Sequence, residues 1–466
     1  MKSNNLLFAF FLILIISFSS TAQNKMGKTI DKDKVTKIID SIAKLAEVYY
    51  ISEEIGKNTG DYIKERHRKG AYNGLSCKKL AKRLTKDMRA VSNDLHMSAF
   101  CSDFKETPSE SALSTKLNTR GEISNYGYVE TKIDKSNIGY LKIEHFSRTQ
   151  FFQEIKKSVD LSMAILKNTN ALIIDIRDND GGFEEIVAYL MSYFFDEEPI
   201  YLQEYYARHL DRKRSISTTN SIPGKKLPEI PIYILVNKDT GSAAESLAYM
   251  MKHLKRATII GETTAGAGNG SNHLRVSKEL MVSIATWETI NSVTKTSWEQ
   301  VGVIPNIETK SKKALKIALD LAEVSAVTYK AKLVDSYKTY LDDMEKALEE
   351  LPNNPESEAL MRSLTDCVKN GLITESGINR LGYDFLTQRK IPTTAEAIFK
   401  SNTVLFPKSA NVFDSYAEAL AINGKLQESI KNYEKAVKIA IENEDSNLEL
   451  FKENLAKVRN QVQPNH

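Results

Sequence analysis

Residues 171–182 read ALIIDIRDNDGG, an apolar run that ends in a polar turn with two glycines. A short apolar run bounded by turn residues is typical of a strand buried inside a sheet. Further apolar runs and amphipathic, helix-like stretches alternate along the chain, at residues 138–143, 151–166, 184–195, 232–236 and 243–254. Strands and helices in alternation predict βαβ units. We therefore expect residues 126–310 to form an α/β core around a mainly parallel sheet.

The N-terminal flank of this core has a different periodicity. Apolar residues recur at helical spacing over residues 34–59 and again over residues 77–91. This pattern predicts a small helical bundle within residues 24–100. Residues 101–125 are rich in Ser, Thr and Glu and are expected to form a linker between the bundle and the core.

The C-terminal flank is expected to be helical to its end, with residues 311–375 as a helical connector. A repeat is visible in residues 376–466. Small and aromatic residues recur 34 positions apart, pairing Ala395 with Ser429, Phe399 with Tyr433, and Asn402 with Ala436. That period resembles tetratricopeptide repeats, in which such residues close each helix pair. An ordinary amphipathic helix pair also gives similar spacings, so this alternative stays open.

The first residues have the order of a secretory signal. Lys2 is followed by an apolar run at residues 6–16 and by small residues up to Ala22. The run is too short to cross a bilayer, so residues 1–23 are expected to be a cleaved signal peptide. The mature protein is then exported, either periplasmic or secreted, with no membrane span.

Composition and net charge argue against several classes of function. The chain has 466 residues, enough for two to four domains, and a net charge of +4, which gives no electrostatic case for nucleic acid. Its three cysteines lack metal-binding spacing, so neither a metal nor another cofactor is expected. Cys77 and Cys101 are either free or paired in an oxidising compartment.

A serine stands where an α/β sheet usually binds its ligand. Residues 237–245 read NKDTGSAAE, which follows an apolar strand and opens a helix, with Ser242 at the junction. The carboxyl edge of such sheets is the usual binding edge, and a helix start offers free amides to an anion. The functional interpretation makes Ser242 a nucleophile, and the alternative makes it a helix cap.

The two glycines of the first motif suggest a partner for that serine. Paired glycines let the backbone approach a substrate closely. The amides of Gly181 and Ala243 are therefore expected to form an oxyanion hole. A simple tight turn is the structural alternative.

Four motifs in order resemble one family of serine peptidases. They are LIIDIRDNDGG, TGSAAES, GETTAGAGNG and WEQVGVIPNI. The family includes tricorn core proteases, C-terminal-processing proteases and interphotoreceptor retinoid-binding protein, and the similarity covers roughly residues 30–310. It implies a crotonase- or ClpP-like core.

The resemblance also implies a catalytic set. Processing proteases carry a lysine base where this chain has Ala267, so a Ser-Lys dyad is not expected. Tricorn-type enzymes use a histidine in a D-x-H segment, and NDLHM at residues 93–97 places His96 there. Histidine suits the role of general base because it exchanges protons near neutral pH. Glu299 would be the acidic member, although Leu95 replaces the serine that relays between the two in tricorn-type enzymes.

The sequence therefore predicts a serine endopeptidase that acts on unfolded proteins or peptides through an acyl-enzyme on Ser242. A different class of function stays open. The same fold also serves non-catalytic binding, with the repeat tail as the part that contacts a protein partner.

Overall fold

The computed structural model describes residues 29–101, 121–147, 151–196, 198–353 and 358–462. The expected signal peptide lies outside these residues, as does most of the expected linker. The chain divides into two compact units, the first ending at Ala326 and the second beginning at Val327. Within the described residues, no helix is both long and apolar enough to span a membrane.

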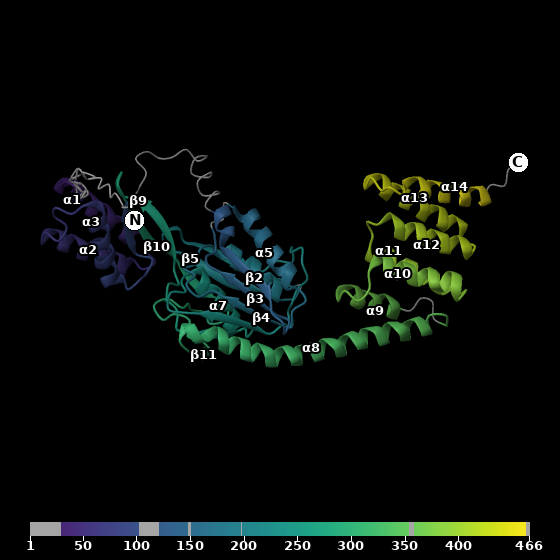
Figure 1. Cartoon of the computed structure of the whole chain (residues 1–466). Helices are drawn as coiled ribbons and strands as arrows, with labels where there is room; N and C mark the ends of the chain where they lie inside the picture. Colours follow the sequence, from purple (N-terminus) through teal and green to yellow (C-terminus); the bar gives the residue numbers. More distant parts are fainter. Residues whose placement is uncertain (1–28, 102–120, 148–150, 197, 354–357, 463–466) are drawn as a thin grey trace, which may run out of the picture. The chain divides into compact units, whose positions relative to one another are not determined.

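The helices and strands follow the expected order (Figure 1). The α-helices are α1 (Lys32–Tyr49), α2 (Glu53–Arg68), α3 (Cys77–Ser92), α5 (Phe152–Leu166), α6 (Glu184–Met191), α7 (Ala243–His253), α8 (Ser311–Glu350), α9 (Glu358–Lys369), α10 (Glu375–Tyr383), α11 (Pro392–Leu405), α12 (Ala410–Ile422), α13 (Leu426–Glu442) and α14 (Leu448–Val462). The strands are β1 (Ser98–Cys101), β2 (Tyr128–Ile133), β3 (Ile138–Ile143), β4 (Ala171–Asp175), β5 (Tyr201–Ala207), β6 (Arg212–Ser217), β7 (Ile232–Val236), β8 (Thr258–Gly261), β9 (Gly270–Arg275), β10 (Leu280–Asn291) and β11 (Ile307–Glu308).

The core is built on a six-stranded sheet in the order β11-β8-β7-β4-β3-β2. All neighbours are parallel except β2 and β3. Strands β4 and β7 are buried along their whole length, as expected of strands covered on both faces. The prediction of a mainly parallel α/β core is confirmed.

One face of this sheet is covered by the first half of α8. Four alanines at a spacing of four residues, at Ala314, Ala318, Ala322 and Ala326, are buried against β-strand side chains such as Ile173. Small side chains let the helix backbone approach the sheet closely. Residues 311–326, which the sequence assigned to a connector, thus pack as part of the first unit.

A second sheet was not expected from the sequence. It has the order β1-β10-β5-β6, with β9 also paired to β10, and its pairs are antiparallel. Strand β1 pairs Ser98 with Ser283 of β10. This pairing joins the N-terminal bundle to the core directly after the segment that carries His96.

The N-terminal bundle contains three helices where the periodicity suggested two stretches. The expected continuous pattern over residues 34–59 breaks between Tyr49 and Glu53. Ser52 caps α2 by accepting a hydrogen bond from the Ile55 amide at 3.4 Å. The apolar faces of α1, α2 and α3 pack on one another and on β10, where Val282 and Ile284 are fully buried.

A disulfide closes this bundle. Cys77, at the start of α3, is bonded to Cys101, at the end of β1, with their Cα atoms 6.0 Å apart. The sequence had left this pairing open. The covalent ring encloses the turn that carries His96. Cys367 is a buried free thiol on α9.

The second unit is all helical over its described residues. The six equivalent repeat positions fall on α11 and α13, and all six are buried. The helical prediction for the C-terminal region is thereby confirmed.

Candidate active site

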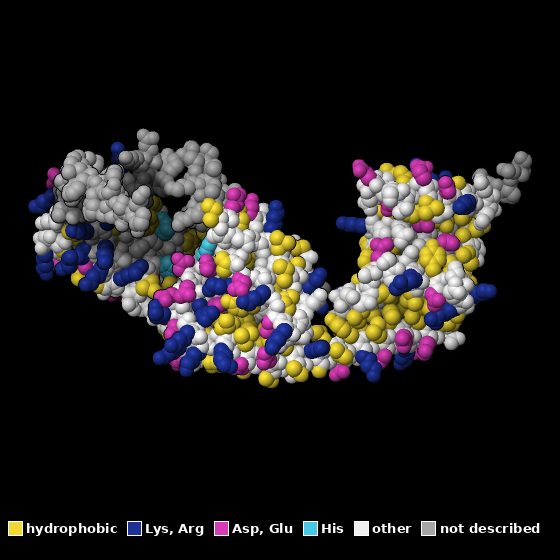
Figure 2. All heavy atoms as spheres, in the orientation of Figure 1, with side chains coloured by type: hydrophobic (Ala, Val, Ile, Leu, Met, Phe, Trp, Pro, Cys, Tyr) yellow, Lys and Arg dark blue, Asp and Glu magenta, His cyan; other side chains and the backbone are white. Residues whose placement is uncertain are grey.

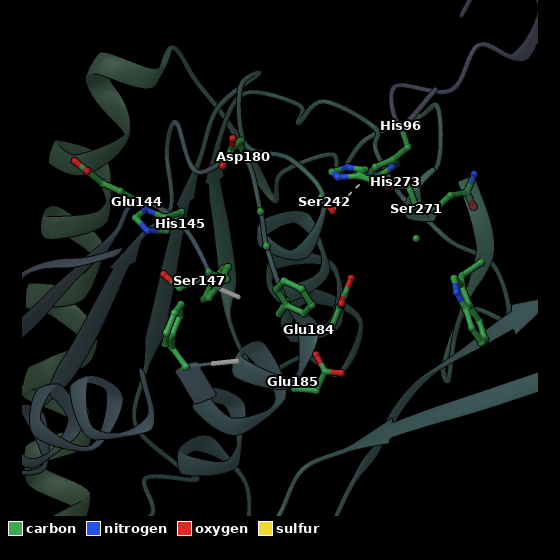
Figure 3. Close-up of a pocket in the computed structure, with 18 of the residues that line it drawn as sticks. His96, Glu144, His145, Ser147, Asp180, Glu184, Glu185, Ser242, Ser271 and His273 are labelled. Atoms are coloured by element: carbon green, nitrogen blue, oxygen red, sulfur yellow. Dashed lines mark hydrogen bonds between the residues drawn. The ribbon is translucent and has the colours of Figure 1, made fainter. Parts of the chain in front are cut away.

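Ser242 lies at the junction of β7 and α7, at the carboxyl edge of the main sheet (Figure 3). Its backbone has φ 50° and ψ −121°, a conformation that side chains of L-residues rarely adopt. Such strain persists only where the surroundings hold it, and it is typical of functional sites. The Ser242 amide donates to Glu245 Oε2 at 2.9 Å, which fixes the turn.

Glu245 ties the serine turn to the loop that follows β8. It is fully buried and accepts hydrogen bonds from the amides of Gly266 at 2.6 Å and Ala267 at 2.8 Å, and from the Thr264 hydroxyl. Burial raises the pKa of Glu245, although these hydrogen bonds oppose the rise. Two of the four sequence motifs therefore meet at one buried carboxyl group.

His96 reaches the serine from the N-terminal bundle. Its Nε2 lies 3.4 Å from Ser242 Oγ, and its side chain is 16% exposed. It sits on the turn between α3 and β1, and Figure 3 shows its ring beside Ser242 and directed toward it. The structure therefore brings together the nucleophile and the base that the sequence predicted.

Asp94 lies directly behind His96 and is fully buried. Its Oδ1 accepts the backbone amide of His96 at 2.7 Å and lies 3.7 Å from the ring Nδ1. Its Oδ2 accepts from Tyr50 Oη at 3.2 Å and from Asn269 Nδ2 at 3.0 Å. Burial alone would raise the pKa of Asp94, but its interactions with His96 and Asn269 outweigh burial and lower it.

Glu299 belongs to the same cluster as Asp94 and His96. Its Oε2 accepts the amides of Gly268 at 2.7 Å and Asn269 at 3.0 Å. Its Oε1 is buried without a hydrogen-bond partner among the described residues. Burial, with a contribution from the charge of Asp94, raises the pKa of Glu299 to about 7.

No hydrogen bond joins Glu299 to His96 within the described part of the chain. Leu95 occupies the position of the serine that connects the acidic residue to the histidine in tricorn-type enzymes, and it cannot make that connection. Its side chain is apolar and 40% exposed, and its carbonyl accepts a hydrogen bond from Arg89. Asp94, His96 and Glu299 present polar atoms within 4.8 Å of one another, close enough to share an ion. This spacing alone does not identify a metal site.

The expected oxyanion hole is only partly prepared. Ala243 is the first residue of α7, where helix amides have no acceptor within the helix. A Cβ on Gly181 would lie 2.6 Å from the Ser242 Cβ, so only glycine fits here. The Gly181 amide, however, donates to Asn179 Oδ1 at 2.9 Å. The Gly181 amide could therefore bind an oxyanion only if its hydrogen bond to Asn179 Oδ1 were shared with the oxyanion or broken.

The pair opens onto a cleft of about 1580 Å³. Besides His96 and Ser242, the cleft is lined by the Gly181 turn, by Trp287 and by the β9 segment 270–273. Figure 2 shows basic and acidic side chains intermixed over the α/β core. The lining of the cleft also carries charged side chains of both signs, among them Arg177, Arg214, Asp180 and Glu185.

Comparison with known proteins matches two parts of the chain to a peptidase family. Residues 137–309 match the family described as "Peptidase family S41". Residues 31–125 match the N-terminal domain of this peptidase in eukaryotic IRBP. The chain belongs to peptidase family S41, a family of serine peptidases, and it carries an IRBP-type N-terminal domain. The resemblance drawn from the four motifs is confirmed.

Similar proteins include C-terminal-processing enzymes. Carboxyl-terminal-processing peptidase 2, chloroplastic, of Arabidopsis thaliana is 33% identical over 174 residues, covering 36% of this chain and 31% of that protein. Carboxy-terminal processing protease CtpB of Bacillus subtilis (strain 168) is 27% identical over 184 residues, which cover 39% of this chain and 36% of that protein. The chain thus spans about a third of the length of these relatives. The crystal structure of the tricorn protease has a TM-score of 0.42 at 13% identity and covers 63% of this chain and 37% of that one.

Proposed function

We propose that this protein is a serine endopeptidase that hydrolyses unfolded proteins or peptides through an acyl-enzyme on Ser242. The observation that carries the proposal is the 3.4 Å separation of Ser242 Oγ and His96 Nε2 at the wall of an open cleft. A serine beside a histidine in this geometry is the arrangement of an activated nucleophile. Hydrogen bonds of catalytic pairs commonly shorten when substrate binds.

The reaction follows from these positions. His96 Nε2 takes the hydroxyl proton while Ser242 Oγ attacks the carbonyl carbon of the scissile bond. The Ala243 amide, with that of Gly181 once it is released from Asn179, binds the negative oxygen. His96 then gives its proton to the leaving amine, and the C–N bond breaks. A water molecule, deprotonated in the same way, hydrolyses the ester and frees Ser242.

Glu299, the acidic residue expected from the sequence, lies beside Asp94 and His96 and contributes to the electrostatic environment of the base. A lysine base is not supported, because Ala267 occupies the position where processing proteases carry it, and its amide binds Glu245 at 2.8 Å. The reaction therefore follows the tricorn style of catalysis.

We also propose that the protein is exported. A disulfide between Cys77 and Cys101 supports this location, because such bonds persist in oxidising compartments. The second unit, in this proposal, is a tetratricopeptide-like module that binds a protein partner. The equivalence of buried positions on α11 and α13 supports this interpretation.

The second candidate is a non-catalytic binding protein on the same fold. The observation that favours it is the Gly181 amide, which is already bonded to Asn179 Oδ1. A binder would have no need to release that amide. Under this alternative the cleft would hold a peptide without cutting it.

A fluorophosphonate probe separates the two candidates. It forms a covalent bond only with an activated serine, so the wild-type protein should be labelled and Ser242→Ala should not. Release of new amino termini from an unfolded protein substrate should follow the same pattern. A wild-type protein that binds unfolded substrate but neither reacts with the probe nor cuts would favour the binding function.

A further inference from the structure

A catalytic histidine needs a partner behind its ring. While Nε2 exchanges a proton with the serine, Nδ1 must carry the other proton, and a carboxylate there fixes the tautomer and stabilises the imidazolium. Two carboxyl groups, Asp94 and Glu299, lie behind His96. The exposed, apolar Leu95 cannot connect the more distant of them to the ring.

The contacts of Asp94 are those of an orienting carboxylate. Its Oδ1 already holds the backbone amide of His96 at 2.7 Å and lies 3.7 Å from Nδ1. Nδ1 is buried and has no hydrogen-bond partner among the described residues. A small rotation of the ring would therefore close the Asp94 contact without breaking any other hydrogen bond of Nδ1.

The other oxygen of Asp94 is held from two sides. Tyr50 donates to Oδ2 from the end of α1, and Asn269 donates to it from the loop after β8. Two donors on one oxygen leave the other oxygen directed at His96. All three groups are buried, which strengthens these hydrogen bonds.

Glu299 is arranged for a different task. Its Oε2 is engaged by two consecutive backbone amides, of Gly268 and Asn269, rather than by the histidine. It thereby positions the loop that presents the Asn269 side chain to Asp94. Burial beside Asp94 also favours its protonated form near neutral pH.

We propose that Asp94 is the positioning carboxylate of His96, held in place by Tyr50 and Asn269, and that Glu299 acts through Asp94. The inference rests on the proposed Ser242 and His96 pair. It makes the N-terminal bundle the source of the base and of its carboxylate, since Tyr50, Asp94 and His96 all come from it, while the core contributes Asn269.

Arg208, a residue of the core, holds the end of α1 in place next to Tyr50. Arg208 Nη2 donates to the carbonyls of Glu47 and Val48, at 2.9 Å each, and its Nε donates to that of Tyr50 at 3.3 Å. These carbonyls belong to the last turn of α1 and the residue after it, where no intrahelical donor is available. The position of the Tyr50 hydroxyl is thus fixed relative to the catalytic core.

The test compares Asp94→Asn with Glu299→Gln in the full-length protein. We expect Asp94→Asn to lower kcat by at least about a hundredfold, as loss of an orienting carboxylate does elsewhere. KM should change little. Glu299→Gln should lower kcat by less than about tenfold, because it removes no direct contact to the ring. The acid limb of the pH–rate profile should move to lower pH further in Asp94→Asn than in Glu299→Gln, since the nearer negative neighbour that stabilises the imidazolium is lost.

A second pair of variants covers the case in which Asp94→Asn fails to fold. Tyr50→Phe removes one donor to Asp94, and we expect kcat to fall about tenfold, the value of one hydrogen bond to a charged group. Tyr72→Phe is the matched control, because the Tyr72 hydroxyl donates to the buried Asp87 at 2.9 Å in the same bundle, away from the site. It should reduce thermal stability but leave kcat unchanged.

The result that would overturn the inference is the reverse order, with Glu299→Gln nearly inactive and Asp94→Asn or Tyr50→Phe close to wild type. Equal losses of kcat in Tyr50→Phe and Tyr72→Phe would also overturn it, because they would indicate a general effect on the bundle. Failure of the peptidase assignment is recognised separately. In that case the wild-type protein and Ser242→Ala would behave alike with the fluorophosphonate probe.

Discussion

His96 Nε2 lies 3.4 Å from Ser242 Oγ, although 146 residues separate the two in the chain. The pairing of β1 with β10 brings them together, because β1 begins two residues after His96 and is bonded to the core through Ser98 and Ser283. A nucleophile on the core and a base on the bundle therefore meet only when the second sheet is formed. Activity should depend on that docking as much as on either residue.

Ser242→Ala should abolish peptidase activity and leave the fold intact. The change deletes one oxygen at a helix start, whose loss as a cap costs about 1 kcal/mol. Loss of a nucleophile reduces kcat by several orders of magnitude. Turnover of a fluorogenic peptide and the melting temperature measure the two effects.

Ser246→Ala is the matched control for that variant. Ser246 lies one turn further along α7, is fully buried and donates to Gln203 Oε1 at 3.2 Å. Its loss should lower the melting temperature while probe labelling persists. Activity of Ser242→Ala above roughly a tenth of wild type would exclude the assignment of the nucleophile.

Activity should fall as the pH is lowered, because a protonated imidazole cannot take the proton of Ser242. For an ordinary histidine the inflection lies between about pH 5.5 and 7.5. The measurement is kcat/KM for a peptide without ionisable groups. A flat profile from acid to neutral pH would count against His96 as the base.

Glu299 should make the fold less stable as the pH rises from about 4.5 to about 7. Its pKa is raised from the ordinary 4.5 to about 7 in the folded state by burial and by Asp94. In this window the folded protein binds a proton that the unfolded chain has released, so the free energy of unfolding falls with increasing pH. Each unit of pKa difference corresponds to about 1.4 kcal/mol.

Glu299→Gln should flatten this part of the stability curve, measured by urea unfolding at pH 5 and pH 7. The difference between the two proteins isolates Glu299 from other buried acids such as Glu245. If both proteins lost the same stability between these pH values, Glu299 would not be the group that titrates.

The disulfide should contribute to stability more than to catalysis. It joins residues 24 positions apart, and closing a loop of that length stabilises a fold by about 3 kcal/mol in the chain-entropy account. The His96 turn has further support from Arg89, whose Nε donates to the Met97 carbonyl at 3.0 Å. Cys77→Ser with Cys101→Ser should thus lower the melting temperature by several degrees and kcat only modestly.

Cys367→Ser provides the control, since this thiol is free and lies in the second unit. Its melting profile should respond to reductant as the wild type does. Equal melting temperatures for the wild type with and without reductant would contradict a stabilising bond.

The parallel sheet could be predicted because its strands are continuous apolar runs. Strands β3 and β7 have the expected bounds, 138–143 and 232–236. The second sheet could not be predicted, because its strands mix polar with apolar side chains, and β6 is exposed at all but one of its positions. Such segments become strands through pairing with distant partners, which local periodicity does not record.

The pairing of Ser242 with His96 could also be predicted from local sequence. Ser242 and His96 each lie in a recognisable local motif. The roles of Tyr50 and Asn269 depend on contacts across 44 and 175 positions with Asp94, which only the folded chain creates. Asp94 itself had a local signal, since it is the first residue of the D-x-H segment. The hydrogen bond from the Gly181 amide to Asn179 Oδ1 is also evident only in the folded chain.

The final prediction concerns where the peptidase ends. Ending the chain at Lys310 would remove the four buried alanines of α8 and expose the sheet residues beneath them, such as Ile173 and Leu235. We expect that protein to be unstable.

Ending the chain at Lys330 instead keeps the contacts of the four alanines and one further helical turn, and no proposed catalytic residue lies beyond Glu299. Hydrolysis of a short peptide should then be largely retained, while cleavage of a protein substrate that the tail recruits should be weakened. Equal losses on both substrates would mean that the second unit supports the active site and does not recruit substrate.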